Sequence, residues 1–204
     1  MNTAVVLIDG GYLRATRRGP AVSARHVVSV VREIHTLVET RLCNDGERLR
    51  WLRSYFYDTD PFEGTLRQPD GKILDLSDTF AARNQRRLLA ELRYEDQVAV
   101  RAGVIRFRAW ESTNGVYRPI FQQKGVDMKI GLDIAWLATK KIADVIVLVT
   151  ADSDFVSPMK LARREGTIVC ICTLTDNKLT PELAGNADVV VKVEGWARRS
   201  SNDQ

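Results

Sequence analysis

The stretch Ile146-Val147-Leu148-Val149-Thr150-Ala151-Asp152-Ser153-Asp154-Phe155 passes from an apolar run into two carboxylates and then into a helical pattern. A short, almost wholly apolar run is typical of a strand buried on both faces of a parallel sheet, and ligands of such sheets bind beyond the carboxyl ends of the strands. We therefore predict a central strand at residues 142–149, with Asp152 and Asp154 at its functional edge. Alternatively, Asp152 or Ser153 only caps the next helix, and Asp154 complements the helix dipole.

A second apolar run ends in the same way near the start of the chain. Residues 4–8 are β-rich, and Asp9-Gly10-Gly11 follows them, where glycine permits a tight turn and a close approach to a ligand. Asp9 therefore occupies the same kind of place as Asp152. Carboxylates gathered at one edge of a sheet repel each other unless a cation joins them, so the two strand ends predict an acidic, cation-binding site.

The rest of the chain alternates between strand-like and helix-like patterns. The patterns predict strands at residues 49–57, 98–110, 116–122, 166–172 and 188–191, and helices at residues 23–40, 77–96, 126–138, 153–165 and 177–185. This order is typical of a doubly wound α/β fold. We predict a Rossmann-like, mostly parallel sheet with helices on both faces, formed by one domain at residues 1–195 and followed by a polar tail at residues 196–204.

Further acidic residues have more varied surroundings. Asp127 falls in the first turn of an expected helix, where the helix dipole favours a carboxylate. Asp133 lies about 600° of helix rotation further on and so well off the Asp127 face. It is therefore at most a supporting residue of the site. Asp58 and Asp60 could join an acidic site, but they stand just before a proline, a pattern typical of a turn, and we favour the turn. Residues 62–75 are expected to form a loop.

Composition limits the class of protein. The chain has 204 residues, of which 45% are hydrophobic and 27% charged, as in a soluble globular protein. Its apolar runs are too short to span a bilayer, and the residues after Met1 do not have the pattern of a signal peptide. Cys43, Cys170 and Cys172 suit a reducing compartment. We expect a cytoplasmic protein without a membrane partner.

Basic residues form two clusters. Lys and Arg total 30 against 26 Asp and Glu, a net charge of +4 that alone says little about a nucleic-acid partner. One cluster follows the first expected strand and the other occupies the helix expected at residues 77–96: Arg14, Arg17, Arg18 and Arg25, then Arg83, Arg86, Arg87 and Arg93. Each cluster is either a nucleic-acid surface or an ordinary solvated face, and the sequence leaves both interpretations open.

Three segments together resemble the NYN domains of the PIN-like nuclease superfamily, in particular the LabA-like group. They are residues 6–11 (VLIDGG), residues 124–127 (KGVD) and residues 150–155 (TADSDF), and their order and spacing match along the chain from residue 4 to about residue 191. The resemblance implies a Rossmann-like sheet of five or six strands with an acidic pocket that binds Mg²⁺ or Mn²⁺ and cuts RNA. The acidic positions of the family correspond here to Asp9, Asp127, Asp152 and Asp154.

The chemistry of the residues agrees with this resemblance. Mg²⁺ typically uses one or two carboxylates and keeps several waters, so a hydrolytic site of this kind requires neither His nor Cys. Single-stranded RNA is the expected substrate. Its phosphates would be contacted by Lys124 and by Arg14, Arg17 and Arg18, unless these are ordinary solvated charges. Tyr12 would either stack on a base or pack against the neighbouring loop.

Three functions remain open on the sequence. The first is a metal-dependent nuclease, specifically an endoribonuclease. The second is a non-catalytic or weakly active module of the same fold that binds RNA or a protein; the segment Gly11-Tyr12-Leu13, which lacks an Asn often present in the family, favours it. The third is another Mg²⁺-dependent phosphoryl enzyme such as a phosphatase, but Gly10-Gly11 follows Asp9 where an Asp-x-Asp motif would be needed. The oligomeric state is also open, a homodimer included.

Overall fold

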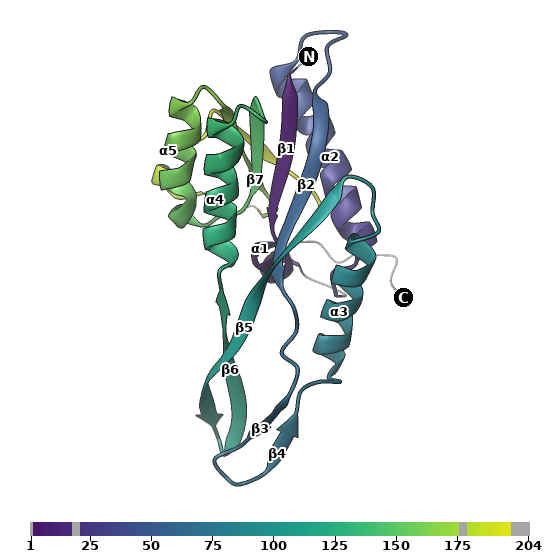
Figure 1. Ribbon diagram of the computed structural model, residues 1–204, viewed down its shortest axis with the longest axis vertical. Coiled ribbons are helices and arrows are strands. Elements are labelled where there is room, and N and C mark those ends of the chain that lie inside the picture. Colours follow the sequence, from purple (N-terminus) through teal and green to yellow (C-terminus); the bar gives the residue numbers. More distant parts are fainter. Residues whose placement is uncertain (1, 18–20, 176–178, 197–204) are drawn as a thin grey trace.

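A seven-stranded sheet forms the centre of the molecule (Figure 1). The computed structural model describes residues 2–17, 21–175 and 179–196, and the strand order is β6-β5-β2-β1-β7-β8-β9. The strands are β1 (Thr3–Asp9), β2 (Arg50–Thr59), β5 (Val98–Thr113), β6 (Val116–Lys124), β7 (Val145–Val149), β8 (Ile168–Thr173) and β9 (Val189–Lys192). All neighbouring strands are parallel except β5 and β6. The predicted mostly parallel α/β fold is confirmed, with seven strands in place of five or six.

Helices cover both faces of this sheet, because alternate residues of the central strands point to opposite layers. On one face, Val6 and Ile8 pack in a core with α1 (Gly10–Thr16), α2 (Ala24–Leu42) and α3 (Phe80–Leu92). On the other face, Val5 and Leu7 pack with α4 (Val126–Thr139), α5 (Val156–Arg164) and α6 (Pro181–Gly185). Burial on two sides is the reason that these strands appear as unbroken apolar runs in the sequence.

None of the helices in the described part of the chain is long and apolar enough to cross a membrane.

The antiparallel hairpin of β5 and β6 extends beyond the rest of the sheet (Figure 1). The last residue of β5 that pairs with β2 is Gly103, and from there residues 104–124 continue as a two-stranded hairpin that we call the arm. Beside it lies a second hairpin, formed by β3 (Thr65–Arg67) and β4 (Ile73–Asp75). The Trp110 indole N–H donates to the carbonyl oxygen of Arg67 at 3.1 Å and joins the two hairpins.

The loop predicted at residues 62–75 is therefore wrong, since this segment contains β3 and β4. Both strands are three residues long, and in each only the central residue is half-buried while its neighbours are exposed. Strands this short and this exposed have no apolar run or sustained alternation by which a sequence pattern would reveal them.

The turn predicted at Asp58 is also wrong. Asp58 lies within β2, its side chain is fully buried, and it forms an ion pair with Arg14 of α1. The helix reaches this strand because it begins with glycine: a Cβ on Gly10 would lie 2.6 Å from Asp58 Oδ2 and 2.8 Å from the Tyr57 carbonyl oxygen. The glycine after Asp9 thus allows close approach, although to the neighbouring strand rather than to a ligand.

Candidate active site

The candidate site lies at the carboxyl edge of the sheet, where β1 and β7 end side by side. Ile8 pairs with Val149 in register, so Asp9, the last residue of β1, and Asp152, three residues after β7, follow adjacent strands. Asp127 comes from the first turn of α4, as predicted. Burial is the main cause that raises the pKa of Asp9 and of Asp127; the charge of Asp127 adds to the rise at Asp9, and the charges of Asp152 and Asp154 add to the rise at Asp127. Four carboxylates from three separate segments therefore act on each other.

Asp9 is held in place by the start of α1. Its Oδ1 accepts a hydrogen bond from the backbone N–H of Tyr12 at 3.1 Å, and its side chain is half-buried. Burial raises the pKa of this carboxyl group, and the charge of Asp127 adds to that effect, while the backbone N–H groups of Tyr12 and Gly11 oppose it. The ionised carboxylate thus has two donors but remains in an environment that a cation would stabilise.

Asp152 and Asp154 lie on the turn between β7 and α5. The backbone N–H of Asp152 donates to Thr150 Oγ1 at 3.1 Å, and Asp152 Oδ1 accepts from the backbone N–H of Asp154 at 2.9 Å. Asp152 is therefore the N-cap of the 3₁₀ turn Ser153–Phe155, as the capping alternative proposed. Capping occupies one of its two carboxylate oxygens, and the exposure of both acidic residues leaves them accessible to a ligand.

The donor set suits a hydrated divalent cation better than a fully enclosed one. All four side chains offer hard oxygen ligands, and Mg²⁺ needs only one or two of them beside water. The pKa of Asp9 and of Asp127 is raised, partly by neighbouring carboxylates, which is the repulsion that a bound cation removes. However, within the described part of the chain no three acidic, His or Cys side chains are grouped closely enough to form a ready metal site. Because Mg²⁺ needs only one or two carboxylates and keeps several waters, one or two of these side chains could hold such an ion without a group of three.

Gln123 is a neighbour of this site that the sequence patterns did not indicate. A Cβ on Gly11 would lie 3.1 Å from Asp9 Oδ1 and 3.6 Å from Gln123 Oε1, so the carboxamide and the carboxylate approach the same point. The hairpin of β5 and β6 brings Gln123 there. The sequence predicted this hairpin without its register, and without the register no pattern connects Gln123 with Asp9.

The basic and aromatic residues predicted to bind RNA have different surroundings. Arg14 pairs with the buried Asp58, and Arg17 lies over the ring of Trp196 at 4.8 Å and donates to its carbonyl oxygen at 3.2 Å. Tyr12 is half-buried, and its hydroxyl oxygen accepts from the backbone N–H of Leu174 at 3.1 Å, which corresponds to the packing alternative. Arg18 lies outside the described residues.

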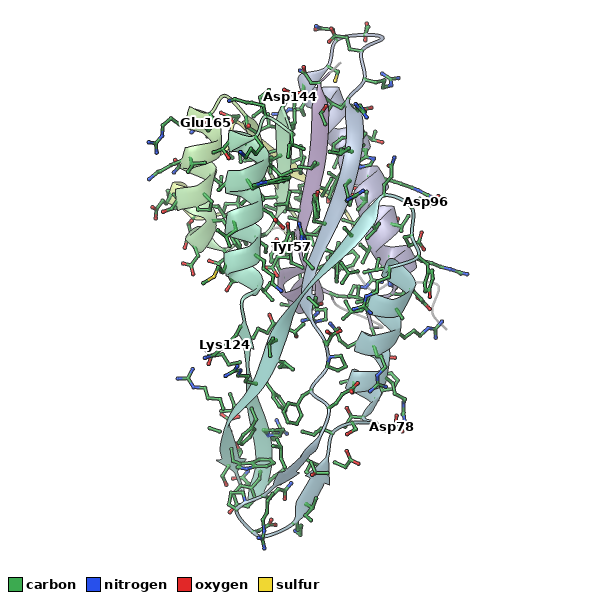
Figure 2. All side chains as sticks on the ribbon, in the orientation of Figure 1. Tyr57, Asp78, Asp96, Lys124, Asp144 and Glu165 are labelled. Atoms are coloured by element: carbon green, nitrogen blue, oxygen red, sulfur yellow. The ribbon has the colours of Figure 1, made fainter. Side chains whose placement is uncertain are left out.

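Lys124 differs from these residues because it remains exposed at the end of β6, two residues before α4 begins (Figure 2). Three further cations of the arm were not recognised from the sequence: Arg106, Arg108 and Arg118. All three are exposed. These arginines do not form a basic run in the sequence, because they are spread over two strands. Only the pairing of the strands brings them together with Lys124.

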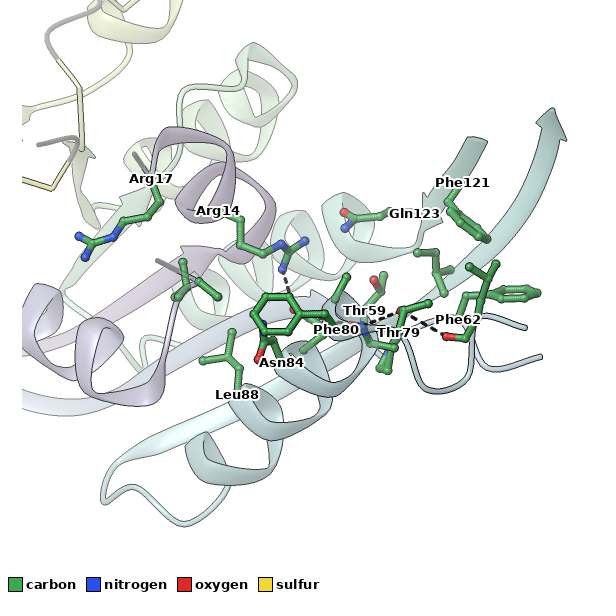
Figure 3. Close-up of a pocket in the computed structure, with 18 residues that line it drawn as sticks. Arg14, Arg17, Thr59, Phe62, Thr79, Phe80, Asn84, Leu88, Phe121 and Gln123 are labelled. Carbon is green, nitrogen blue, oxygen red and sulfur yellow. Dashed lines mark hydrogen bonds between the residues drawn. The ribbon is translucent and has the colours of Figure 1, made fainter. Parts of the chain in front are cut away.

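A groove of about 520 Å³ lies between α1, α3, the segment after β2 and the arm (Figure 3). Its walls are mainly apolar and include Phe62, Phe80 and Phe121, while Arg14 and Gln123 stand at its edge towards α1. Phe80 is 72% exposed, which is unusual for a large apolar side chain. Because Gln123 borders both the groove and Asp9, the groove adjoins the carboxylate site.

Comparison with protein families agrees with this arrangement. A family model described as NYN domain matches residues 70–194, which is more than half of the chain. The chain belongs to the NYN domain family. The matched region contains Asp127, Asp152 and Asp154, whereas Asp9 and β1 precede it.

A crystal structure of a protein of unknown function from Vibrio parahaemolyticus is similar over 95% of this chain and 94% of that chain, with a TM-score of 0.45 and 13% sequence identity. No curated protein matches the chain.

Proposed function

We propose that this NYN domain protein is a metal-dependent ribonuclease that hydrolyses phosphodiester bonds of single-stranded RNA, specifically an endoribonuclease. The proposal depends mainly on one observation: in a chain of a family that is typically nucleolytic, four carboxylates from three segments act on each other at the carboxyl edge of the sheet. In α/β sheets this edge is the usual place of ligand binding.

Each residue of the site has a separate role in this proposal. Asp9, Asp127, Asp152 and Asp154 would hold Mg²⁺ or Mn²⁺, both of which prefer oxygen ligands. When bound, such an ion supplies charge neutralisation at the phosphate and lowers the pKa of water, as in-line hydrolysis requires. Asp9 is oriented by the Tyr12 N–H, and Asp152 by its cap on the following turn. Lys124, which is exposed three residues before Asp127, would contact a phosphate.

The test uses three single variants and one matched control. Labelled single-stranded RNA is incubated with the wild type, Asp9→Asn, Asp127→Asn and Asp152→Asn, each with Mg²⁺, with Mn²⁺ and with EDTA. Asp96→Asn is the control, because Asp96 is exposed and lies far from Lys124 and the site (Figure 2). We expect metal-dependent cleavage that falls at least about 100-fold in each site variant and is unchanged in the control. Equal cleavage by Asp152→Asn and the wild type would contradict the proposal.

A second candidate function is an RNA- or protein-binding regulatory module without significant catalysis. It is favoured by the finding that no three metal-binding side chains are grouped as a ready site in the described residues. The same experiment separates the two functions. RNA binding that weakens with salt, without cleavage in either metal, would support the regulatory module.

A further inference from the structure

The exposed face of the arm carries cations that form no salt bridge with any residue the structure describes. Strand pairing places Val104 opposite Lys124, Arg106 opposite Gln122, and Glu111 opposite Arg118. Cross-strand partners point to the same face of a hairpin, and all of these residues are exposed. We call this surface the outer face of the arm.

The inner face of the arm differs because its apolar side chains are packed, whereas the apolar side chains on the outer face (Val104, Val116 and Ile120) are exposed. The rings of Phe107 and Phe121 lie 6.3 Å apart between centroids, and Phe107 is 5.4 Å from Trp110. Phe62, from the segment after β2, packs on Phe121 at 5.0 Å. The arm is therefore anchored by one face and leaves the other open. A β-bulge between Phe107 and Ala109 adds Arg108, also exposed, to the polar surface.

Among the described residues, none of Arg106, Arg108, Arg118 and Lys124 takes part in a salt bridge of 4.0 Å or less, although Glu111 stands opposite Arg118. Most charged surfaces of folded proteins mix both signs, and one-sided surfaces attract the opposite charge. Four cations against a single carboxylate make the outer face suited to a polyanion.

The arm ends next to the carboxylate site. Lys124 ends the arm, and Asp127 follows three residues later in the first turn of α4. From Lys124 to Arg118 is six residues of strand, or about 20 Å at the usual rise. The carboxylate site repels phosphates, so an RNA strand that reaches it needs cations along its approach.

We infer that the outer face of the arm binds the phosphate backbone of single-stranded RNA and leads the strand to the carboxylate site. This inference rests on the proposed function for the identity of the ligand. Phosphate contacts of this kind position a strand without reading its sequence.

The experiment compares two double variants that remove the same charge from different surfaces. Arg106→Gln/Arg118→Gln changes the arm, and Arg83→Gln/Arg87→Gln changes α3, where each arginine already pairs with a carboxylate. Both are made in the Asp152→Asn background, and binding of an oligouridine of about 20 nucleotides is measured in EDTA between about 50 and 200 mM salt. Circular dichroism and sedimentation confirm that each variant is folded and report its oligomeric state.

Loss of two phosphate contacts should reduce the slope of log K against log salt by about 1.4 in the arm variant. The α3 variant should keep the slope of its parent. The inference would be overturned if the arm variant and its parent had equal slopes, or if the arm and α3 variants lost the same amount of slope. It would also be overturned if the parent did not bind RNA. A changed oligomeric state with an unchanged slope would assign the arm to a protein contact instead.

The two proposals can fail separately in these assays. If the arm variant shows the expected change of slope but the wild-type protein never cleaves RNA, the ribonuclease proposal is overturned and the arm remains an RNA-binding surface. Wild-type protein that cleaves RNA while the arm variant keeps its slope would overturn only the arm.

Discussion

Helix α3 and the arm are both rich in arginine, but they differ in what the fold places around it. Each arginine of α3 has a carboxylate partner, and so does Arg93, the C-cap that follows it: Arg83 with Asp78, Arg86 with Glu63, Arg87 with Glu91 and Arg93 with Asp60, at 2.7 to 3.5 Å. The cations of the arm have none among the described residues. A basic cluster in a sequence therefore predicts a nucleic-acid surface poorly until the positions of the acidic residues are known.

The same distinction applies to the whole molecule. Arg14 of α1, which we predicted to contact phosphate, pairs with a buried aspartate, and its charge also lowers the pKa of Asp9. Among the described residues, the four carboxylates at the sheet edge form no salt bridge. In the part of the chain that the structure describes, the sheet edge thus carries carboxylates without a salt bridge, and the arm carries cations without one. At the sheet edge a cation, and on the arm an anion, would supply the opposite charge.

The largest effect is expected for the buried pair of Arg14 and Asp58. Arg14→Met should lower the free energy of unfolding by about 3 kcal/mol, the low end for such pairs because Arg14 is partly exposed. The loss arises because Asp58 would remain charged in a fully buried position. Urea unfolding at neutral pH measures it.

Two further variants test whether pairing is the cause of this loss. Arg93→Met is the matched control, because its partner Asp60 is only two residues from Asp58 but is exposed; it should cost no more than about 0.5 kcal/mol. Arg14→Met/Asp58→Asn should recover part of the loss, since no charge is then left buried. If Arg14→Met and Arg93→Met were equally stable, burial would not distinguish these two pairs.

Asp9 supplies the corresponding test for the unpaired carboxylates. A carboxyl group whose pKa is raised in the folded state contributes stability at low pH and loses it as the pH rises from about 4 through its folded pKa. Asp9→Asn, which keeps an acceptor for the Tyr12 N–H, should therefore make the metal-free protein more stable at neutral pH. The measurement is thermal unfolding in EDTA from pH 4 to pH 8, where the difference from wild type should grow with pH.

A bound metal ion should make the wild type more stable than Asp9→Asn, the reverse of the order in EDTA. At 100 times its dissociation constant, an ion that binds only the folded state stabilises the wild type by about 2.7 kcal/mol. Asp9→Asn should gain much less, and Asp96→Asn should gain as much as the wild type. Equal stabilisation of all three proteins by Mn²⁺ would exclude Asp9 from the metal site.

The sheet and its acidic edge could be predicted because burial on two faces leaves a clear trace in a sequence. Residues 146–149 are fully buried and wholly apolar, so the strand and its end at Thr150 are evident, and Asp152 follows at once. Asp9 was recognised by the same argument. Asp127 required the resemblance, because a carboxylate in the first turn of a helix is common for other reasons.

The arm and the environment of Asp58 could not be predicted because each depends on contacts distant in sequence. Asp58 stands before Asp60 and a proline, which suggests a turn, and only Arg14 from another segment makes its burial tolerable. On the arm, the bulge between Phe107 and Ala109 shifts the alternation, so the side chains that share the outer face follow from the register alone.

The smallest effect is expected for the exposed pair of Arg86 and Glu63, which represents the paired surface of α3. Arg86 Nε and Nη2 donate to Glu63 Oε1 at 3.1 and 2.9 Å, but Nη2 also donates to the Ser77 carbonyl oxygen at 2.9 Å. Arg86→Gln therefore removes two interactions, and only a double-mutant cycle with Glu63→Gln isolates the ion pair. We expect a coupling energy of about 0.5 kcal/mol that declines towards zero in about 1 M salt, because both side chains are roughly half exposed or more. A coupling above about 2 kcal/mol would show that α3 arginines are held as firmly as Arg14, and the contrast between α3 and the arm would then include rigidity as well as charge.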